Sequence, residues 1–378
     1  MPKILLSANA AWNLANFRGG LIRGLLSAGH ELVAAAPWDE HARRLEVLGC
    51  RFVSLPMDNK GTSPAADARL FQRYRRLIKS QKPDIYLGFT IKPNVYGTLA
   101  ARSLGVPVIN NISGLGTAFI RDSWLTRAVQ ALYRIALTRS SIVFFQNSED
   151  LELFARLRLV QRERVAILPG SGVDLAHHTP APMADRGGAA RFLLIARLLR
   201  DKGVGEYVEA AAAVRRDFPN ARFQILGFLD VDNRTAVTRA EMSAWVAAGL
   251  VDYLGATDDV RPFIAEADCV VLPSYREGTP RTLLEGAAAA RPLIATNVPG
   301  CREPVRDGHN GFLCAVRDGS SLANAMRRFL EASYDARVEM GRRSRAIAED
   351  RYDERFVIDA YLNAIDVALS APRKAVRR

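Results

Sequence analysis

Short runs of apolar residues alternate along the chain with longer stretches in which apolar residues recur at helical spacing. In the first half the short runs predict seven strands, and the longer stretches between them predict helices, such as those at residues 17–28, 66–80 and 124–137. Strands that alternate with helices are typical of a parallel α/β sheet. The predicted strands cover residues 3–7, 31–36, 51–55, 84–89, 107–112, 141–146 and 165–168.

The same pattern starts again after residues 179–188, a segment rich in proline and glycine that is typical of a linker. The chain of 378 residues therefore predicts two Rossmann-like domains, residues 1–175 and 176–352, with a ligand in the cleft between them. A last helix, at about 353–370, is expected to cross back to the first domain. Further strands are predicted at 191–195, 222–226, 252–254, 269–272 and 293–295, and further helices at 205–217, 235–248, 260–267 and 280–290.

The composition is that of an ordinary globular protein, with 49% hydrophobic and 24% charged residues. No run of 18 apolar residues predicts a membrane span, and the first residues lack the apolar core of an export signal. The four cysteines form no CxxC pair, so free thiols and a reducing cytoplasm are expected.

Charge is distributed unevenly along the chain. Residues 1–170 hold 23 basic and 12 acidic residues, a net charge of +11, whereas residues 171–378 carry a net charge of +1. A bias towards arginine explains the choice of basic residue but not the shortage of acidic residues in one half. The asymmetry indicates an anionic partner for the first half, either nucleic acid, phospholipid or a phosphorylated substrate.

Residues 273–285 contain the densest group of candidate functional residues. They follow the predicted strand 269–272, and Thr279 and Pro280 are expected to serve as N-cap and first residue of a helix. The amides around Gly278 would form an anion site at this helix start. Glu277 lies in the turn and Glu285 on the second helical turn, where two carboxylates suit the hydroxyl groups of a sugar nucleotide. Spacing alone also fits a helix with two solvated glutamates.

A second group of candidate residues follows the first strand of the second domain. Arg197 can reach a diphosphate as a bidentate fork, and Lys202 can reach it as a point charge. Taken alone, this segment also fits a solvated loop. The two groups both lie where strands end, which is the edge of a parallel sheet that binds ligands.

Motifs for common cofactors and metals do not match. Phe119 stands where a dinucleotide fingerprint beginning at Gly114 needs its last glycine, and no phosphate-binding P-loop, HExxH or Cys/His cluster occurs. The letters Asp-x-Asp at residues 230–232 lie in a polar loop and are interpreted as surface. Neither a metal nor a bound cofactor is therefore expected.

Arg197, Lys202, Glu277 and Glu285 together resemble the EX7E signature of retaining glycosyltransferases of the GT-B fold, family 4. The segments 168–174, 227–229, 299–303 and 307–313 resemble the same family, so the resemblance covers essentially the whole chain. It implies two Rossmann-like domains, a UDP-sugar as co-substrate, and transfer with retention and without a metal. Stabilisation of the leaving UDP would then fall to fixed charges.

The resemblance also implies a role for each candidate residue. Glu277, Arg197 and Lys202 would be catalytic, with Glu277 on hydroxyls of the donor sugar. Glu285 would bind the ribose, and the uracil would lie against the loop from Gly255 to Val260. The further donor-binding residues implied are Gly19, Gly20, Gly278, Thr279 and Pro280.

Residues 16–18, 91–97, 113–119 and 145–154 resemble the family 4 enzymes of bacterial surface polysaccharide and N-glycan assembly. Those enzymes extend a saccharide on undecaprenyl diphosphate, several of them with an N-acetylhexosamine. Many members carry a histidine after the strand 84–89, where this chain has Thr90 and Lys92 as acceptor-side candidates. The resemblance therefore implies transfer of a hexose or N-acetylhexosamine to a lipid-linked saccharide.

The basic first half then suits a peripheral position at the inner face of the cell membrane. Residues 69–82 contain six basic residues and no acidic one, and the predicted helix 124–137 carries an apolar face with Trp124 and Tyr133. The alternative is that the apolar residues pack in a core and the arginines face solvent. A UDP-sugar epimerase, a glycoside hydrolase and a nucleic-acid-binding protein are the alternatives, and no recognised motif supports nucleic-acid binding.

Overall fold

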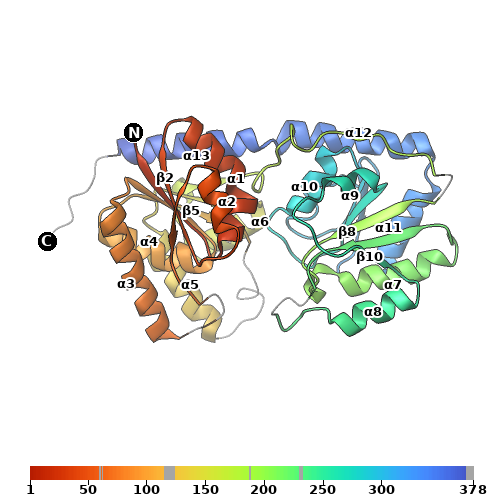
Figure 1. Cartoon of the computed structure of the whole chain (residues 1–378), viewed down its shortest axis with the longest axis horizontal. Helices are drawn as coiled ribbons and strands as arrows, with labels where there is room; N and C mark the ends of the chain where they lie inside the picture. Colours follow the sequence, from red (N-terminus) through yellow and green to blue (C-terminus); the bar gives the residue numbers. More distant parts are fainter. Residues whose placement is uncertain (59–60, 62, 115–123, 187–188, 230–232, 372–378) are drawn as a thin grey trace. The chain divides into compact units, whose positions relative to one another are not determined.

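The structure is a computed structural model that describes residues 1–58, 61, 63–114, 124–186, 189–229 and 233–371. The chain forms two compact units, Met1–Ser171 together with Glu354–Arg378, and Gly172–Asp353. Figure 1 shows each unit as a sheet flanked by helices. The sequence prediction placed the boundary after residue 175, and it also assigned the last helix to the first unit.

All strands of the first unit are parallel, in the order β3-β2-β1-β4-β5-β6-β7. The alternating side chains of β1 pack into different clusters, with Ile4 and Leu6 on one face and Leu5 on the other. Both faces of the sheet are therefore covered. The strands are β1 (Lys3–Ser7), β2 (Glu31–Ala36), β3 (Arg51–Ser54), β4 (Ile85–Phe89), β5 (Val108–Ile112), β6 (Ile142–Phe145) and β7 (Val165–Ile167).

The helices α1 and α13 supply apolar side chains to one face of this sheet, and α3 and α4 cover the other. The helix α5 packs with α6 in a separate cluster against β6. The helices are α1 (Ala11–Ser27), α2 (Ala42–Val47), α3 (Pro64–Gln81), η1 (Pro93–Gly97), α4 (Thr98–Ser103), α5 (Trp124–Leu137), α6 (Ser148–Arg156), η3 (Arg162–Arg164) and α13 (Glu354–Ser370).

The helix α13 returns to the first unit because small residues on α1 leave room for it. A Cβ on Gly20 would lie 1.8 Å from a carboxylate oxygen of Glu354, and a Cβ on Gly24 would lie 2.5 Å from Cγ2 of Ile358. Tyr361 of α13 is buried between Phe89 and Phe144, with ring centroids 6.1 and 4.9 Å away. The predicted packing of the last helix on the first unit is confirmed.

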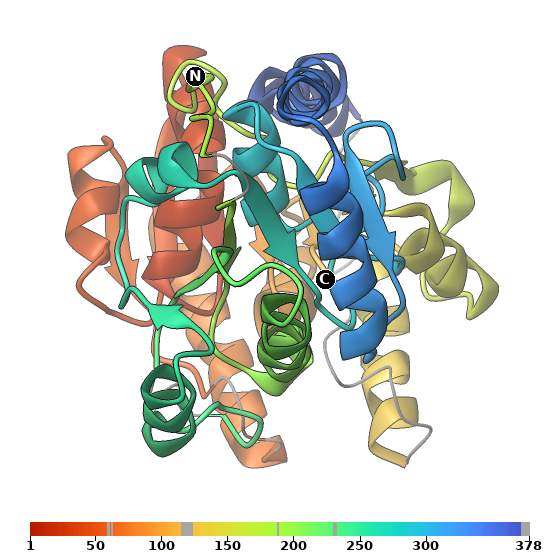
Figure 2. The ribbon, with the colours of Figure 1, turned by 90° about the vertical axis from the view of Figure 1, so that its right-hand side faces the viewer.

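The second unit repeats the architecture with six parallel strands in the order β10-β9-β8-β11-β12-β13. Figure 2, which faces this unit, shows helices on both sides of the sheet. The strands are β8 (Arg191–Ile195), β9 (Arg222–Leu226), β10 (Asp252–Tyr253), β11 (Cys269–Leu272), β12 (Leu293–Thr296) and β13 (Gly311–Cys314). The helices are η4 (Arg200–Lys202), α7 (Val204–Arg215), α8 (Arg239–Ala247), α9 (Arg261–Glu266), α10 (Arg281–Ala288), α11 (Gly319–Glu331) and α12 (Tyr334–Arg351).

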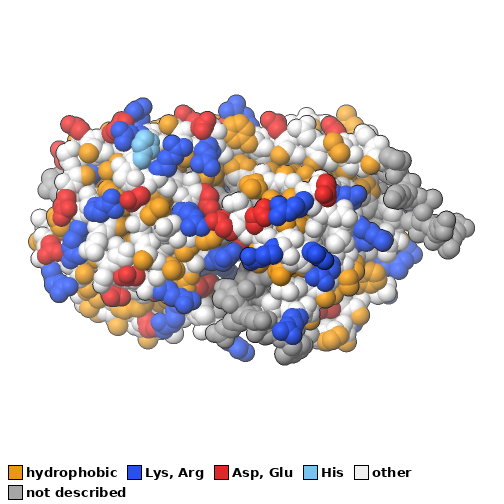
Figure 3. Space-filling model, turned by 180° about the vertical axis from the view of Figure 1, so that it is seen from behind, with side chains coloured by type: hydrophobic (Ala, Val, Ile, Leu, Met, Phe, Trp, Pro, Cys, Tyr) orange, Lys and Arg blue, Asp and Glu red, His pale blue; other side chains and the backbone are white. Residues whose placement is uncertain are grey.

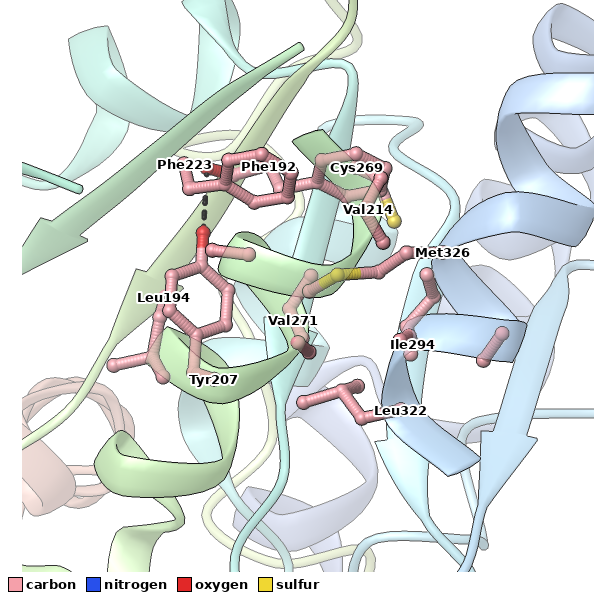
Figure 4. Close-up of a cluster of buried hydrophobic side chains, with 14 of the residues drawn as sticks. Phe192, Leu194, Tyr207, Val214, Phe223, Cys269, Val271, Ile294, Leu322 and Met326 are labelled. Carbon is pink, nitrogen blue, oxygen red and sulfur yellow. Dashed lines mark hydrogen bonds between the residues drawn. The ribbon is translucent and has the colours of Figure 1, made fainter. Parts of the chain in front are cut away.

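A dense core lies between this sheet and the pair α7 and α11. Figure 4 shows Phe192 and Phe223 beside Tyr207, whose hydroxyl donates a hydrogen bond of 2.9 Å to the carbonyl of Phe192. The two phenyl rings are stacked, with centroids 5.4 Å apart. The buried hydroxyl keeps a partner, so an aromatic side chain with a polar end is tolerated in this core.

Three expectations about elements were wrong. The described part of the segment predicted as a linker packs on the second unit, where the carbonyls of Pro182 and Met183 accept hydrogen bonds from Arg291 and Tyr334. The first helix begins at Ala11 rather than at residue 17, and the sequence pattern missed β13, α11 and α12. Within the described residues, no helix is both long enough and apolar enough to span a membrane.

Candidate functional site

Both sheets have a point where the chain reverses its direction of winding. In the second unit, β8 adjoins β11, and the chain continues outwards from these strands in opposite directions. Ligands of open parallel sheets bind outside the carboxyl ends of the strands at this point. The loops that follow β8 and β11 are the two segments predicted to carry Arg197, Lys202 and Glu277.

The structure brings Lys202 and Glu277 together at this edge. The Nζ of Lys202 contacts Oε1 of Glu277, and the two side chains are 15% and 17% exposed. The hydroxyl of Ser274 donates to the same oxygen at 2.8 Å, and Ser274 is itself completely buried. The Glu277 carboxylate is therefore fixed by the Ser274 hydroxyl and lies beside the lysine cation, rather than being a solvated surface group.

Two glycines allow the loops around Glu277 to approach one another. Gly203 has a φ of 73°, and a Cβ there would lie 2.2 Å from the carbonyl oxygen of Pro273. Gly300 has a φ of 83°, and a Cβ there would lie 2.3 Å from the carbonyl oxygen of Gly278. Larger residues would force the loops apart and move Glu277.

The predicted helix start was displaced by one residue. The helix α10 begins at Arg281, Pro280 occupies the N-cap position, and no side chain caps the helix. Thr279 therefore precedes the cap, and Pro280 offers no amide hydrogen for an anion. The hydroxyl of Thr282 instead ties the first turn to the end of β8, through a hydrogen bond of 3.1 Å to the carbonyl of Ile195.

Glu285 lies on the second turn of α10 and is buried, with a side chain that is 10% exposed. Its Oε1 accepts a hydrogen bond of 2.7 Å from Nε of Arg281 and lies 3.8 Å from Nε2 of His178. Burial raises the pKa of Glu285, and the charge of Arg281 opposes that rise. Glu285 thus has a different environment from Glu277, which contacts lysine and serine.

His178, which lies beside Glu285, also lines a cavity of about 330 Å³ in the second unit. Burial, together with the positive charge of Arg281, lowers the pKa of His178 to about 4, so its imidazole is neutral at pH 7. The loop predicted to meet a uracil ends beside the same cavity, where Asp259 pairs with Arg261 at 2.8 Å. The hydrogen bond from Arg261 lowers the pKa of Asp259 to about 2.

The remaining residues predicted on the donor side differ in their contacts. Arg197 is exposed, and none of the described residues makes a hydrogen bond or ion pair with its guanidinium in the structure. Gly255 has a φ of 80°, and a Cβ there would meet no atom within 4 Å. Val260 occupies the N-cap position of α9. The Asp-x-Asp letters at 230–232 lie outside the described residues.

The corresponding point in the first unit lies between β1 and β4. The amide of Asn9 donates a hydrogen bond of 3.1 Å to the hydroxyl of Thr90, which has a φ of 65°. A β-branched residue in this conformation is strained, and strained residues are concentrated at functional sites. Thr90 is therefore a strained residue at the switch point of the first sheet, and its acceptor-side role stays a prediction.

Lys92 is engaged elsewhere. Its Nζ lies 2.7 Å from a carboxylate oxygen of Asp67, and the hydroxyl of Tyr96 donates to the other oxygen at 2.7 Å. The Lys92 and Asp67 side chains are 13% and 16% exposed. Lys92 thus has a structural role in the first unit, where its ion pair with Asp67 links the start of η1 to α3.

The glycine pair of α1 also has a structural use. Gly20 lies against Glu354, as described above, whereas a Cβ on Gly19 would meet only Arg23, at 3.7 Å. Approach of a donor diphosphate to this pair stays a prediction.

The prediction that α5 contacts a membrane through its apolar face is wrong for its described side chains, because Tyr133 is buried and Val129 packs on the same core. The side chains of residues 124 and 125 lie outside those described.

Sequence reasoning missed two residues that the structure adds to the edge of the second unit. Ser274 lies within residues 273–285 but was not singled out there, and His178 is one of five histidines in the sequence. Neither residue stands in a motif that would have identified its contact with Glu277 or Glu285. Among the described residues, no group of three His, Cys, Asp or Glu side chains is placed to bind a metal ion.

Comparison with known proteins identifies two domain families. Residues 15–170 match the family described as glycosyl transferase 4-like domain, and residues 189–332 match the family described as glycosyl transferases group 1. The two matches fall on the two units of the structure.

Curated relatives match over most of the chain. An N,N'-diacetylbacillosaminyl-diphospho-undecaprenol alpha-1,3-N-acetylgalactosaminyltransferase from Campylobacter jejuni is 24% identical over 95% of this chain and 97% of its own. A UDP-Gal:alpha-D-GlcNAc-diphosphoundecaprenol alpha-1,3-galactosyltransferase from Escherichia coli is 28% identical over 73% of this chain and 72% of its own.

Solved structures share the fold at lower sequence identity. Anabaena HepE in complex with UDP and glucose has a TM-score of 0.79 and 16% identity, covering 97% of this chain and all of that chain. The predicted GT-B fold, with two parallel α/β sheets, is confirmed.

Proposed function

Since the chain is a GT-B glycosyltransferase, with a 4-like domain followed by a group 1 domain, we propose that it transfers a hexose or N-acetylhexosamine from a UDP-sugar to a polyprenyl-diphosphate-linked saccharide. The contact of Lys202 with Glu277 at the carboxyl edge of the second sheet carries this proposal. The lysine cation suits the diphosphate of a sugar nucleotide, and the neighbouring carboxylate suits the hydroxyl groups of its sugar.

Different residues of the second unit bind different parts of the donor. Lys202 and the exposed Arg197 bind the diphosphate and stabilise the charge that grows on the leaving UDP. Glu277 accepts hydrogen bonds from hydroxyls of the donor sugar. Glu285 binds the ribose, and the loop from Gly255 to Val260 contacts the uracil. The assignment rests on the position of each side chain at one edge of one sheet.

The acceptor belongs to the first unit in this proposal. Thr90 lies at its switch point, and the names of the two relatives above both specify a saccharide on diphospho-undecaprenol. Transfer would proceed with retention, the departing phosphate accepting the proton of the attacking hydroxyl on the same face of the sugar. A lipid-linked acceptor also calls for a peripheral position at the inner face of the membrane, where the basic first unit would meet anionic lipid.

The alternatives lack comparable support. A UDP-sugar epimerase would convert its substrate with no acceptor present, and a nucleic-acid-binding protein would show no affinity for sugar nucleotides. Both matched families are described as glycosyl transferases, which favours transfer.

The proposal is tested in two steps. A thermal-shift panel of nucleotides and sugar nucleotides should single out UDP and one UDP-sugar. That UDP-sugar is then incubated with N-acetylhexosamine on undecaprenyl diphosphate, and the product is identified by mass spectrometry. Formation of a disaccharide with an α linkage supports the proposal. A melting temperature that no nucleotide or sugar nucleotide raises, or conversion of the UDP-sugar without an acceptor, would contradict it.

Metal independence is part of the same proposal, because Arg197 and Lys202 supply positive charge where a divalent cation would otherwise be needed. Transfer should continue unchanged in excess EDTA. Loss of activity in EDTA that Mg²⁺ or Mn²⁺ restores would assign the stabilisation of UDP to a metal instead. Binding of UDP in EDTA, measured by calorimetry, separates an effect on the donor from an effect on the acceptor.

A further inference from the structure

A large aromatic side chain is exposed at the ligand-binding edge of the first unit. Trp38 is 64% exposed and lies two residues beyond the end of β2, the strand that adjoins β1 on the side away from β4. Its indole therefore presents a large, rigid aromatic face to a ligand at this edge. Its position places it at the same edge as Thr90.

The backbone that carries Trp38 is fixed rather than loose. The carboxylate of Asp39 accepts hydrogen bonds from the amide of Trp12 at 3.0 Å and from the amide of His41 at 2.9 Å. Trp12 stands in the first turn of α1, three residues after Asn9, whose amide binds Thr90. A short series of hydrogen bonds therefore joins the Trp38 loop to the switch point of the sheet.

The charges beside Trp38 indicate what kind of ligand it meets. Asp39 and Glu40 follow it directly in the chain; the Asp39 carboxylate accepts the two amide hydrogen bonds described above, and Glu40 is exposed. Carboxylates disfavour an anionic lipid surface or a nucleic acid at this position. They suit a neutral ligand that has hydroxyl groups to donate and a flat face of C–H groups to lie on an aromatic ring, which is the chemistry of a pyranose.

We infer that Trp38 is a binding residue for the saccharide of the acceptor, stacking on the sugar that receives the transferred residue. The inference rests on the proposed function and adds to it a specific contact on the acceptor side. Trp38 would determine how tightly the acceptor is held. It would take no part in binding the donor, for which the second unit carries the proposed residues.

The test compares Trp38→Ala, Trp38→Phe and wild type on a water-soluble acceptor, N-acetylglucosamine on geranyl diphosphate. Removal of an aromatic binding residue should raise the KM for this acceptor about tenfold or more. Phenylalanine should retain most of the affinity, and kcat and the KM for the UDP-sugar should stay near wild type. Phe356→Ala, which truncates another exposed aromatic of the first unit, is the matched control.

The outcomes separate this inference from the function on which it rests. If wild type transfers and Trp38→Ala has an unchanged KM for the geranyl acceptor, Trp38 does not bind the saccharide. A defect seen only with undecaprenyl acceptor in vesicles would mean that Trp38 contacts lipid, and it would overturn the inference too. If wild type transfers to neither acceptor, the proposed function itself fails. Melting temperature and UDP affinity of each variant verify that it is folded.

Discussion

Glu277 and Glu285 are eight positions apart in the chain and contact different partners, and this difference supports the separate roles proposed for them. Glu277 contacts Lys202 and Ser274, whereas Glu285 is buried against Arg281 and His178. Their positions near a helix start were predictable from the strand, turn and proline around them. Their partners were not, because no motif marks the Ser274 hydroxyl within residues 273–285, and His178 comes to Glu285 through the packing of a segment distant in the chain.

The two carboxylates should therefore respond differently to removal. Glu285→Ala is expected to weaken UDP binding by about tenfold, because a charged hydrogen-bond acceptor for the ribose is lost. Glu277→Ala should reduce turnover by about 100-fold while changing UDP affinity less, because UDP has no donor sugar. Calorimetry with UDP and steady-state kinetics measure the two effects. Equal losses of UDP affinity would contradict this division, and Glu331→Ala, at an exposed position, serves as the control.

His178 should make stability depend on pH. Its pKa is lowered from 6.5 to about 4 in the folded protein, because burial and the charge of Arg281 disfavour the imidazolium. As pH falls from 6.5 towards 4, the unfolded chain binds a proton that the folded chain does not, so stability decreases. Above pH 6.5 the histidine is neutral in both states and this term is absent.

The expected loss between pH 7 and pH 4.5 is about 2 kcal/mol from this residue. Urea unfolding at the two pH values should show that His178→Gln loses less stability than wild type over that interval. His309→Gln, which changes a histidine elsewhere in the second unit, should behave like wild type. The same pH dependence in wild type and in His178→Gln would show that the buried imidazole does not cause it.

At the scale of elements, strands were easier to predict than helix boundaries. Buried parallel strands consist of short continuous apolar runs, so β1, β2, β8 and β9 appear directly in the sequence. The strand β13 escaped prediction because its four residues follow a polar turn and include a glycine. The first turns of α1 escaped because alanine and asparagine there show little amphipathic pattern, and Asp39 of a distant loop binds the amide of Trp12.

The contact of α1 with α13 depends on glycine at the crossing. Gly24→Ala would put a Cβ 2.5 Å from Ile358, and the strain should outweigh the gain in helix propensity, with a net loss of about 1 kcal/mol. Gly205→Ala on α7 meets no atom within 4 Å and should be neutral or stabilising. Urea unfolding of both variants gives the comparison. Adding Ile358→Ala should make Gly24→Ala less costly; if the two substitutions are additive, the crossing does not impose the glycine.

At the scale of the whole molecule, the net charge of +12 derives mainly from the first unit. Figure 3 shows basic side chains on the surface of both units, interspersed with acidic and hydrophobic ones. The helix α3 is different, because from Arg69 to the residue after its last turn, Lys82, it carries six basic side chains without an acidic one. The charge of this helix was predictable from composition, whereas the burial of Tyr133 on α5 depends on tertiary packing.

The helix α3 should therefore bring the protein to anionic membranes. Arg69, Arg76 and Lys79 are exposed and suit charge reversal, whereas Arg73 donates a hydrogen bond of 2.7 Å to the carbonyl of Pro56 and Arg75 lies over the ring of Phe71. Each basic residue near such a surface contributes about 1 kcal/mol. Changing the three exposed residues to glutamate should reduce binding to phosphatidylserine vesicles more than 100-fold at low salt.

The control must separate the position of the charges from the total charge. Reversing Arg216, Arg222 and Arg234, which are exposed in the second unit, changes the net charge by the same amount and should weaken vesicle binding much less. Binding by wild type should fall as salt rises, because charges are screened over about 8 Å at physiological ionic strength. UDP affinity should be unchanged in both triple variants. Equal losses of vesicle binding would mean that net charge, and not α3, attracts the protein to the membrane.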